Sequence, residues 1–576
     1  MLALYEDVHW ADPTTLELIG RVVDMVQRLR VLALVTYRPE FVPPWAGHGR
    51  LTSLSLGRLG RRQGGAMVER VTGGRALPAE VLGTILDRTD GVPLFVEELT
   101  KTVLESGLLR EEGDRYALAG PLPPLAIPST LQDSLMARLD RLASAKEVAQ
   151  VAAVIGREFP HRLLAAVAPT SPTLLGDALE QLVDVELVFR RGAPPDAVYT
   201  FKHALVQDAA YQSLLRSKRQ QLHARIAEVL EVRSLDVGET GPEVLARHLT
   251  EAGLAERAIP HWRRAGELAA GRSANVEAIA HLGKALELLG TLPNSRERPD
   301  DELNLQLAIG GPLLATRGYA APEVERTYSR AWALCDRLGR PAELFAVLRG
   351  LWNCYLVRGE YRRAHDLAER LVALADEQGV PLRRALARRA RGTVLFFLGR
   401  FADAAAALDE GIAIDDAVGA WEERRADLLL HTERAAVACR LYSAEALWFL
   451  GFPDGARERI EGGLALAHRL EHPNSLAFAL TWAAILHNFR REFAEARGRA
   501  EAAMEIAGRH RMSAWFGHAS VCRGFALAGL GQRTADRAAP RRPGRLERDG
   551  RPPARHHVAR LPRRRPSPGG SARRRP

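Results

Sequence analysis

The sequence has 576 residues but only four cysteines, and no two of them form a CxxC pair. They are Cys335, Cys354, Cys439 and Cys522. So sparse a set excludes a disulfide-stapled scaffold and argues against a zinc ribbon. It is typical of a protein that stays in a reducing cytosol.

Long apolar runs are also missing. No stretch approaches the roughly 20 apolar residues that cross a bilayer, and Glu6 and Asp7 stand where a signal peptide needs its basic and apolar regions. We therefore expect a cytoplasmic protein that makes no membrane contact. The composition, 47% hydrophobic and 26% charged, excludes a wholly disordered or fibrous chain, and the length allows about three or four domains.

The net charge of +10 is concentrated at the C-terminus. Residues 533–576 hold fifteen arginines, no lysine and three acidic residues, so this segment carries +12 and the first 532 residues carry −2. Because it is rich in Pro and Gly and has almost no aliphatic residues, it cannot bury a core, and we expect disorder. The segment is either a basic arm for nucleic acid or anionic lipid, or an out-of-frame reading of GC-rich DNA.

The first forty residues predict a βαβ unit. The apolar run 2–5 suits a buried parallel strand. Asp12 and Pro13 fit the N-cap and first position of a helix that reaches about Arg28. A second apolar run covers 31–37, and a crossover of this length makes the two strands parallel.

Charged residues follow both predicted strands, with Glu6 and Asp7 after the first and Arg38 after the second. Ligands of parallel sheets bind beyond the carboxyl ends of the strands. Carboxylates at that edge can hold Mg²⁺ and polarise an attacking water, and an arginine can contact a terminal phosphate. The alternative is a sheet whose charged residues only mark the strand ends.

The strings LYEDVHWAD at 4–12 and VTYRP at 35–39 resemble the Walker B and sensor strands of bacterial STAND-type ATPases. These are regulatory AAA-like modules of class III adenylate cyclase-type and LuxR-type signalling proteins. The resemblance implies that Glu6 and Asp7 serve Mg²⁺ binding and water activation, and that Arg38 senses the γ-phosphate of ATP. It implies packing or positioning roles for His9 and Trp10.

Two further strings extend the resemblance. TDGVPLFVEEL at 89–99 resembles the family's GxP motif between two lid helices, which implies that Pro93 packs near the adenine of ATP or ADP. YTFKHALVQDAAY at 199–211 resembles the winged-helix segment whose histidine, here His203, reaches the β-phosphate of ADP. Ala204 replaces the family's usual Asp. By itself a Gly-x-Pro is a turn signal, and a lone histidine at a helix start is more often structural.

The phosphate-binding loop of this superfamily is absent from the sequence. It requires GxxxxGK[ST], whose glycines let backbone N–H groups cradle the phosphates. The chain's single Gly-Lys pair, Gly283-Lys284, lacks the earlier glycine and the following Ser or Thr. We expect a chain truncated or mis-started at its Walker B strand, which does not hydrolyse ATP alone. ATP turnover that Asp7→Asn abolishes would contradict this.

A repeated turn dominates the C-terminal half. GEYRRA at 359–364 recurs as GRFADA at 399–404, GFPDGA at 451–456 and REFAEA at 491–496, at intervals of 40, 52 and 40 residues. Each copy marks a turn between two amphipathic helices, and the set resembles tetratricopeptide repeats of unusual length. The array is either a spacer or a partner-binding surface. A fifth turn is due at Gly531, but no second helix follows it. This favours the out-of-frame interpretation of the tail.

We therefore predict a mostly α protein with a partial α/β P-loop NTPase and an α-solenoid. The expected segments are a partial NTPase (1–59), a helical lid (60–120), a winged-helix domain (121–220), tetratricopeptide-like repeats (221–532) and the tail (533–576). The 187–191 and 198–201 stretches are expected to form the wing hairpin. Since no basic recognition helix stands out, we favour a nucleotide-clamping role for the winged helix over DNA binding.

The resulting hypothesis is the regulatory ATP/ADP switch and protein-interaction region of a bacterial signalling protein. It lacks a P-loop and an output domain. ADP would hold it closed, and a protein or small-molecule inducer on the repeats would favour opening, ATP exchange and oligomerisation. One rival is a tetratricopeptide-type scaffold with a vestigial ATPase. Another is a nucleic-acid binder acting through the tail, which predicts steeply salt-dependent binding.

Overall fold

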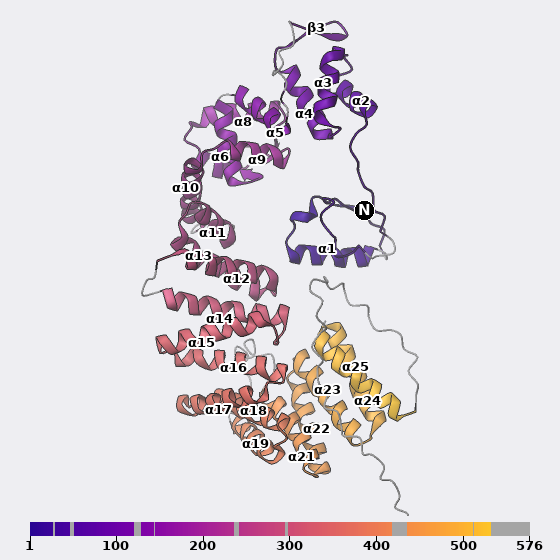
Figure 1. Cartoon of the computed structure of the whole chain (residues 1–576), viewed down its shortest axis with the longest axis vertical. Coiled ribbons are helices and arrows are strands. Elements are labelled where there is room, and N and C mark those ends of the chain that lie inside the picture. Colours follow the sequence, from indigo (N-terminus) through magenta and orange to yellow (C-terminus); the bar gives the residue numbers. More distant parts are fainter. Residues whose placement is uncertain are drawn as a thin grey trace, which may run out of the picture. The chain divides into compact units, whose positions relative to one another are not determined.

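The computed structural model describes residues 1–26, 29–46, 51–119, 128, 130–142, 144–234, 241–293, 298–417, 435–510 and 512–531. Met1–Gln532 forms one compact unit. The predictions for the basic tail lie outside the described residues. Within the described part the protein is mostly helical, with small sheets confined to the residues before 202, as predicted (Figure 1).

The N-terminal segment is a βαβ unit, as the sequence predicts, but the expectation of a buried first strand is wrong, because Leu2 is 61% exposed and Leu4 54% exposed. β1 (Leu2–Tyr5) and β2 (Leu32–Val35) pair in parallel, with Leu2 opposite Leu32. α1 (Pro13–Val26) connects them, and the Asp12 carboxylate accepts hydrogen bonds from the backbone N–H and the hydroxyl of Thr15. The small core beneath the sheet is built around Val8, Ile19 and Trp45.

Three helices and a hairpin follow: α2 (Arg61–Val71), α3 (Ala79–Thr89), α4 (Pro93–Leu104), β3 (Leu109–Glu112) and β4 (Arg115–Leu118). The segment 60–120, expected to be helical, contains the β3–β4 hairpin beyond α4. Gly107 and Gly113 adopt left-handed φ angles of 74° and 64°, which end the helix and turn the hairpin. Between α3 and α4, Gly91 has a φ of 69°, and a Cβ there would lie 2.2 Å from the Leu59 carbonyl oxygen.

The middle domain combines helices with one antiparallel sheet in the order β5-β7-β6. Its elements are α5 (Leu131–Arg141), α6 (Ser144–Ile155), β5 (Glu158–Pro160), α7 (His161–Val167), α8 (Pro172–Asp184), β6 (Val188–Arg191), β7 (Val198–Phe201) and α9 (Ala204–Gln212). The predicted hairpin is confirmed, since β6 and β7 pair with Val188 opposite Phe201.

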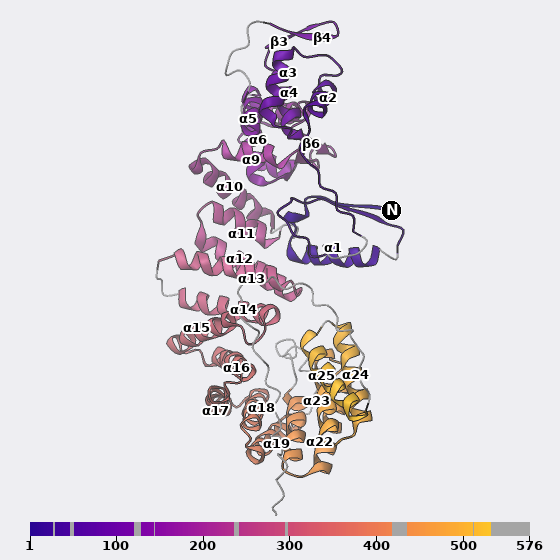
Figure 2. The same ribbon diagram turned by 45° about the vertical axis from the view of Figure 1, so that its right-hand side comes forward.

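The remaining described elements are helices. They are α10 (Arg216–Ser234), α11 (Pro242–Glu251), α12 (Ala255–Gly271), α13 (Asn275–Thr291), α14 (Arg298–Arg317), α15 (Pro322–Leu338), α16 (Pro341–Arg358), α17 (Tyr361–Gln378), α18 (Pro381–Phe397), α19 (Phe401–Ala417), α21 (Ala435–Phe449), α22 (Pro453–Arg469), α23 (Pro473–Phe489), α24 (Phe493–Arg509) and α25 (Ser513–Gly529). Successive helices from α10 onward pack as neighbouring hairpins, the arrangement of tetratricopeptide-like repeats (Figures 1 and 2).

The predicted repeat turns are confirmed. Gly359, Gly399, Gly451 and Gly531 have left-handed φ angles between 73° and 89°, and Arg491 reaches 60° although it carries a side chain. The alanines of the repeated motif begin the second helix of each pair and are fully buried; they are Ala364, Ala404, Ala456 and Ala496. The small side chain therefore lets the two helices of each pair approach closely.

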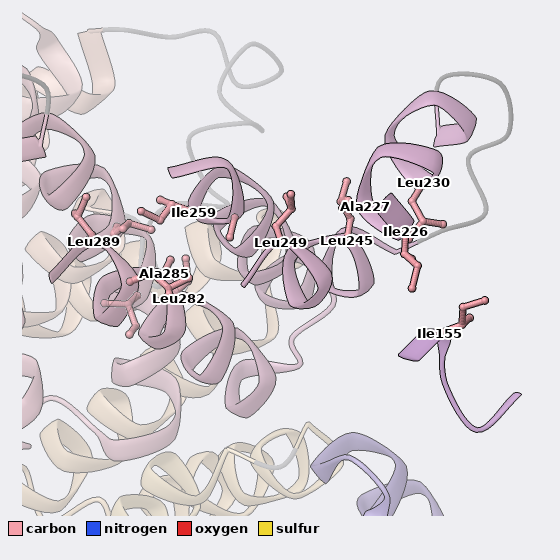
Figure 3. Packing of buried hydrophobic residues seen from close by; sticks show 14 of the residues in the cluster. Ile155, Ile226, Ala227, Leu230, Leu245, Leu249, Ile259, Leu282, Ala285 and Leu289 are labelled. Atoms are coloured by element: carbon pink, nitrogen blue, oxygen red, sulfur yellow. The ribbon is translucent and has the colours of Figure 1, made fainter. Parts of the chain in front are cut away.

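One hydrophobic core runs from the middle domain into the repeats. Ile155 at the end of α6 belongs to the same cluster as Ile226 and Leu230 of α10, and the cluster continues through Leu249 of α11 to Leu282 of α13 (Figure 3). Because protein cores are close-packed, a displacement of one helix shifts or strains the helices that pack against it.

Candidate functional site

The loops after β1 and β2 are tied to each other. Asp7 has a left-handed φ of 53°, and its N–H donates to the Thr36 hydroxyl at 2.9 Å. The N–H of Val8 donates to the Thr36 carbonyl oxygen at 3.0 Å. Glu6 and Asp7 are therefore exposed side chains at the carboxyl edge of the two strands, at the place the sequence predicts.

Arg38 lies at the same edge. Its guanidinium carbon is 5.9 Å from the centre of the Trp10 ring, which is 73% exposed. The His9 ring is 5.2 Å from the same indole. At an exposed site, a cation–π contact of this kind contributes roughly 0.5–1 kcal/mol of interaction free energy. Trp10 thus positions Arg38, a contact that the sequence alone did not indicate.

Pro93 is the first residue of α4, where its missing N–H costs no hydrogen bond. The next turns of α4 carry Glu97 and Glu98, which face the middle domain. Glu98 and Arg138 are both at least 98% buried and pair at 2.5 Å, and Arg138 also donates to Glu105 at 2.9 Å. This deeply buried pair joins α4 to α5. No sequence pattern indicates it, because its two residues are forty positions apart.

A second cluster of charges lies beside this pair. Lys202 donates to Glu97 at 2.9 Å and to Glu186 at 3.2 Å, and Lys101 donates to the same two carboxylates at 3.0 and 2.6 Å. Hydrogen bonds and charge from the two lysines lower the pKa of Glu186 to about 2. The network ties α4 to the loop before β6 and to the residue before His203.

His203 is the N-cap residue of α9, but its side chain makes no capping hydrogen bond. Its Nε2 atom is buried and has no hydrogen-bond partner. Burial lowers the pKa of His203, and Glu98 and Arg157 are among the charges that act on it. The ring is therefore a neutral group with an unused nitrogen beside α4.

Arg157 connects the predicted site residues. Its guanidinium lies 3.6 Å from the Asp7 carboxylate, and its carbonyl oxygen accepts a hydrogen bond from the N–H of Phe201, two residues before His203, at 2.9 Å. Arg157 thus links Asp7 to the strand that leads into His203, while Pro93 reaches the same region only through α4. Among the described residues, no hydrogen bond or ion pair joins Glu6 or Arg38 to His203.

Glu6 and Asp7 supply oxygen atoms of the kind that Mg²⁺ prefers. Within the described ranges, however, no group of three or more His, Cys, Asp or Glu side chains is arranged to hold a metal ion. These residues therefore do not complete a Mg²⁺ site by themselves.

Among the helices that the structure describes, none combines the length and the apolar character of a membrane-spanning segment.

The repeats hold a separate buried polar group. Glu445 on α21 is only 5% exposed, and its Oε1 atom has no hydrogen-bond partner. Burial raises the pKa of Glu445 to about 8. Nearby, Asn488 donates to the Cys522 carbonyl oxygen at 3.1 Å. Nothing in the repeat pattern predicted a buried carboxyl group at this position.

Comparison with known proteins gives distant similarities. No family model matches the chain. An uncharacterized protein of Rhizobium meliloti (strain 1021) is 28% identical over 530 residues, which cover 91% of this chain. The chain spans about half of that protein's length, since 50% of it is covered.

Among solved structures, a Signal Transduction ATPase with Numerous Domains (STAND) protein with a tetratricopeptide repeat sensor from Pyrococcus horikoshii is 12% identical. The match covers 92% of this chain and 78% of that one, with a TM-score of 0.35. Aspartyl phosphate phosphatase F of Bacillus subtilis is 11% identical over 83% and 96% of the two chains, with a TM-score of 0.30. Yeast Tom70 is 12% identical over 81% and 82%, with a TM-score of 0.29.

Proposed function

We propose that this chain is the regulatory region of a nucleotide-controlled signalling protein, of adenylate cyclase-like or LuxR-like type. In this proposal the helical repeats receive a partner, and the middle domain relays their state to a nucleotide site. Asp7, Arg38, Pro93 and His203 would line that site. The observation that carries the proposal is the ion pair of Asp7 with Arg157 at 3.6 Å, because the carbonyl oxygen of Arg157 is in turn hydrogen-bonded to Phe201, two residues before His203.

The relay follows from the packing. α10 crosses from the middle domain into the repeats, and its Ile226 and Leu230 share the core with Ile155 (Figure 3). The buried Glu98–Arg138 pair joins α5 to the lid helix that begins at Pro93. A movement of the repeats would therefore reach α4 through packed elements, and nucleotide binding would act in the reverse direction with the same coupling free energy.

His203 would serve as the nucleotide sensor. Its neutral ring has an unused Nε2 atom, which suits a hydrogen bond to a phosphate group of ADP. When bound with Mg²⁺, ATP or ADP would supply the phosphate charge that Arg38 and Arg157 complement. The P-loop that cradles these phosphates would have to come from a segment that this sequence does not contain.

The test is ADP–Mg²⁺ binding by calorimetry, with the chain joined to a P-loop segment. We expect binding, and about a tenfold loss of affinity for His203→Ala, which corresponds to ~1.4 kcal/mol. His161→Ala is the matched control, since His161 lies in the same domain and also has an unpartnered buried nitrogen. If the joined chain does not bind ADP, the chain is a tetratricopeptide-type scaffold with a vestigial ATPase.

A further inference from the structure

Two hydrogen-bond acceptors are buried without a partner on neighbouring helices of the repeat array. Glu445 of α21 is 5% exposed, and its Oε1 atom has no hydrogen-bond partner. Asn488 of α23 is 8% exposed. Its Nδ2 atom donates to the Cys522 carbonyl oxygen of α25 at 3.1 Å, but its Oδ1 atom has no partner either. Because nearly all buried polar atoms in proteins are hydrogen-bonded, these two acceptors indicate a donor that the chain itself does not supply.

The packing of the repeats does not require a carboxyl group at this position. The residues equivalent to Glu445, counted from the repeat turns, are Thr393 in α18 and Ile485 in α23. Neighbouring repeats therefore form with an uncharged side chain at the same place. A buried carboxyl group without a partner lowers the stability of the fold. A residue that costs stability and is not needed for packing is a candidate binding residue.

Aromatic rings flank Glu445. The Tyr442 ring, one turn earlier on α21, lies 5.4 Å from the Trp482 ring of α23. Ile485 packs against the cluster that contains Cys522 of α25, and the positions 40 residues before Cys522 and Ile485 are Trp482 and Glu445. By this equivalence the Trp482 indole lies against the Glu445 side chain. Trp482 and Ile485 are only partly buried, so this side of the carboxyl group can be reached from solvent.

We propose that Tyr442, Glu445, Trp482 and Asn488 bind a protonated amine or a guanidinium group, and that this group is the part of a partner which the repeats recognise. Its N–H groups would donate to Oε1 of Glu445 and Oδ1 of Asn488, and its charge would be attracted by the carboxylate and by the faces of the two rings. An anion or an apolar group would leave both acceptors unsatisfied. The inference rests on the proposed role of the repeats as the receiver of a partner.

Binding of a cation at this site should release a proton. Burial raises the pKa of Glu445 to about 8, so the free carboxyl group is about 90% protonated at pH 7. When the ligand donates its N–H group to the carboxylate, the carboxyl proton passes to the buffer. The Cys522 thiol of α25 does not contribute, because burial and the charge of Glu445 raise its pKa to about 11. Almost one proton should therefore leave for each ligand bound at pH 7.

The test is titration calorimetry of the full chain without nucleotide, in two buffers of different ionisation enthalpy. One probe is agmatine, a free amine that also carries a guanidinium group, and the other is a blocked tripeptide with arginine between two glycines. We expect a Kd below about 1 mM for at least one probe, together with proton release. Tighter binding of agmatine identifies a small-molecule amine as the source of the group, and tighter binding of the tripeptide identifies a side chain of a protein partner.

Glu445→Gln should weaken binding about 30-fold, which corresponds to ~2 kcal/mol, and should abolish the proton release. This substitution removes a buried ionisable group and should stabilise the fold at pH 7, so unfolding cannot explain a loss of affinity. Glu458→Gln is the matched control, since Glu458 is an exposed glutamate on α22 of the same repeat, and it should bind as the parent does.

A Kd above about 1 mM for both probes, or equal affinity of Glu445→Gln and the parent chain, would overturn the proposal. Because no nucleotide is present, this result is separate from a failure of ADP to bind.

Discussion

Acid should loosen the junction between the middle domain and the repeats, because two histidines are buried there in neutral form. His223 of α10 and His248 of α11 are 4% and 1% exposed, and their Nδ1 atoms lie 2.8 Å apart. The Tyr211 hydroxyl lies 3.2 Å from Nε2 of His223. A hydrogen bond at this distance needs one of the two Nδ1 atoms to be unprotonated, so a proton added at that atom removes the bond.

The magnitude follows from the two pKa values. Burial, together with Arg247, lowers the pKa of His223 to about 4 and that of His248 to about 3. In the unfolded chain both groups titrate near 6.5. As the pH falls below 6.5, the unfolded state therefore binds two protons that the folded state does not bind, and stability falls. At pH 5 each histidine costs about 2 kcal/mol, or about 4 kcal/mol together.

Hydrogen–deuterium exchange measures this effect locally. We expect the protection factors of amides in α10 and α11, taken relative to unfolded peptide at each pH, to fall steeply between pH 6.5 and 5. His248→Gln should remove about half of the pH dependence, whereas His510→Gln, at an exposed helix end, should leave it unchanged. The reasoning is refuted if His248→Gln and the parent chain lose protection equally on acidification.

Two further changes test single features of the fold. Gly91→Ala should lower the free energy of unfolding by more than 2 kcal/mol, because the added Cβ meets the Leu59 carbonyl oxygen and φ is left-handed. Gly73→Ala, with φ of 68° and open space, isolates the dihedral cost alone at about 1 kcal/mol. Both are read from chemical denaturation, and equal losses would contradict the clash. Burial raises the pKa of Glu445 to about 8. Its contribution to the free energy of unfolding is therefore fully present below pH 4.5, where the carboxyl group is protonated in both states, and is lost as the pH rises toward 8. Glu445→Gln should therefore raise stability at pH 7 by about 3 kcal/mol and remove this pH dependence, and an unchanged pH profile would contradict the assignment.

The sequence predicted the parts of the fold that have a local cause. The βαβ unit follows from two short apolar runs and the Asp12 cap, and the repeat turns follow from a recurring six-residue motif that starts with glycine in three of its four copies. The β3–β4 hairpin was missed because Gly107 and Gly113 were not recognised as turn residues inside an apparently helical stretch. In this stretch the preference of glycine for turn conformations outweighs the helical spacing of the apolar residues.

The contacts that build the candidate site could not be predicted, because they join distant segments. Arg157 reaches Asp7 across 150 positions, and Arg138 reaches Glu98 across forty. No motif marks either arginine, since an ion pair depends on how whole elements pack. The roles of Glu6, Asp7, Arg38, Pro93 and His203 in nucleotide binding remain predictions that the resemblance supplied.

The most direct test of the relay is hydrogen exchange on the chain joined to a P-loop segment, with and without ADP–Mg²⁺. We expect ADP to raise protection at α4 and α9, and also at α10 and α11, which share the core with the middle domain. His203→Ala should abolish the increase at α10 and α11. Protection that changes only before α9, while ADP still binds, would contradict the relay.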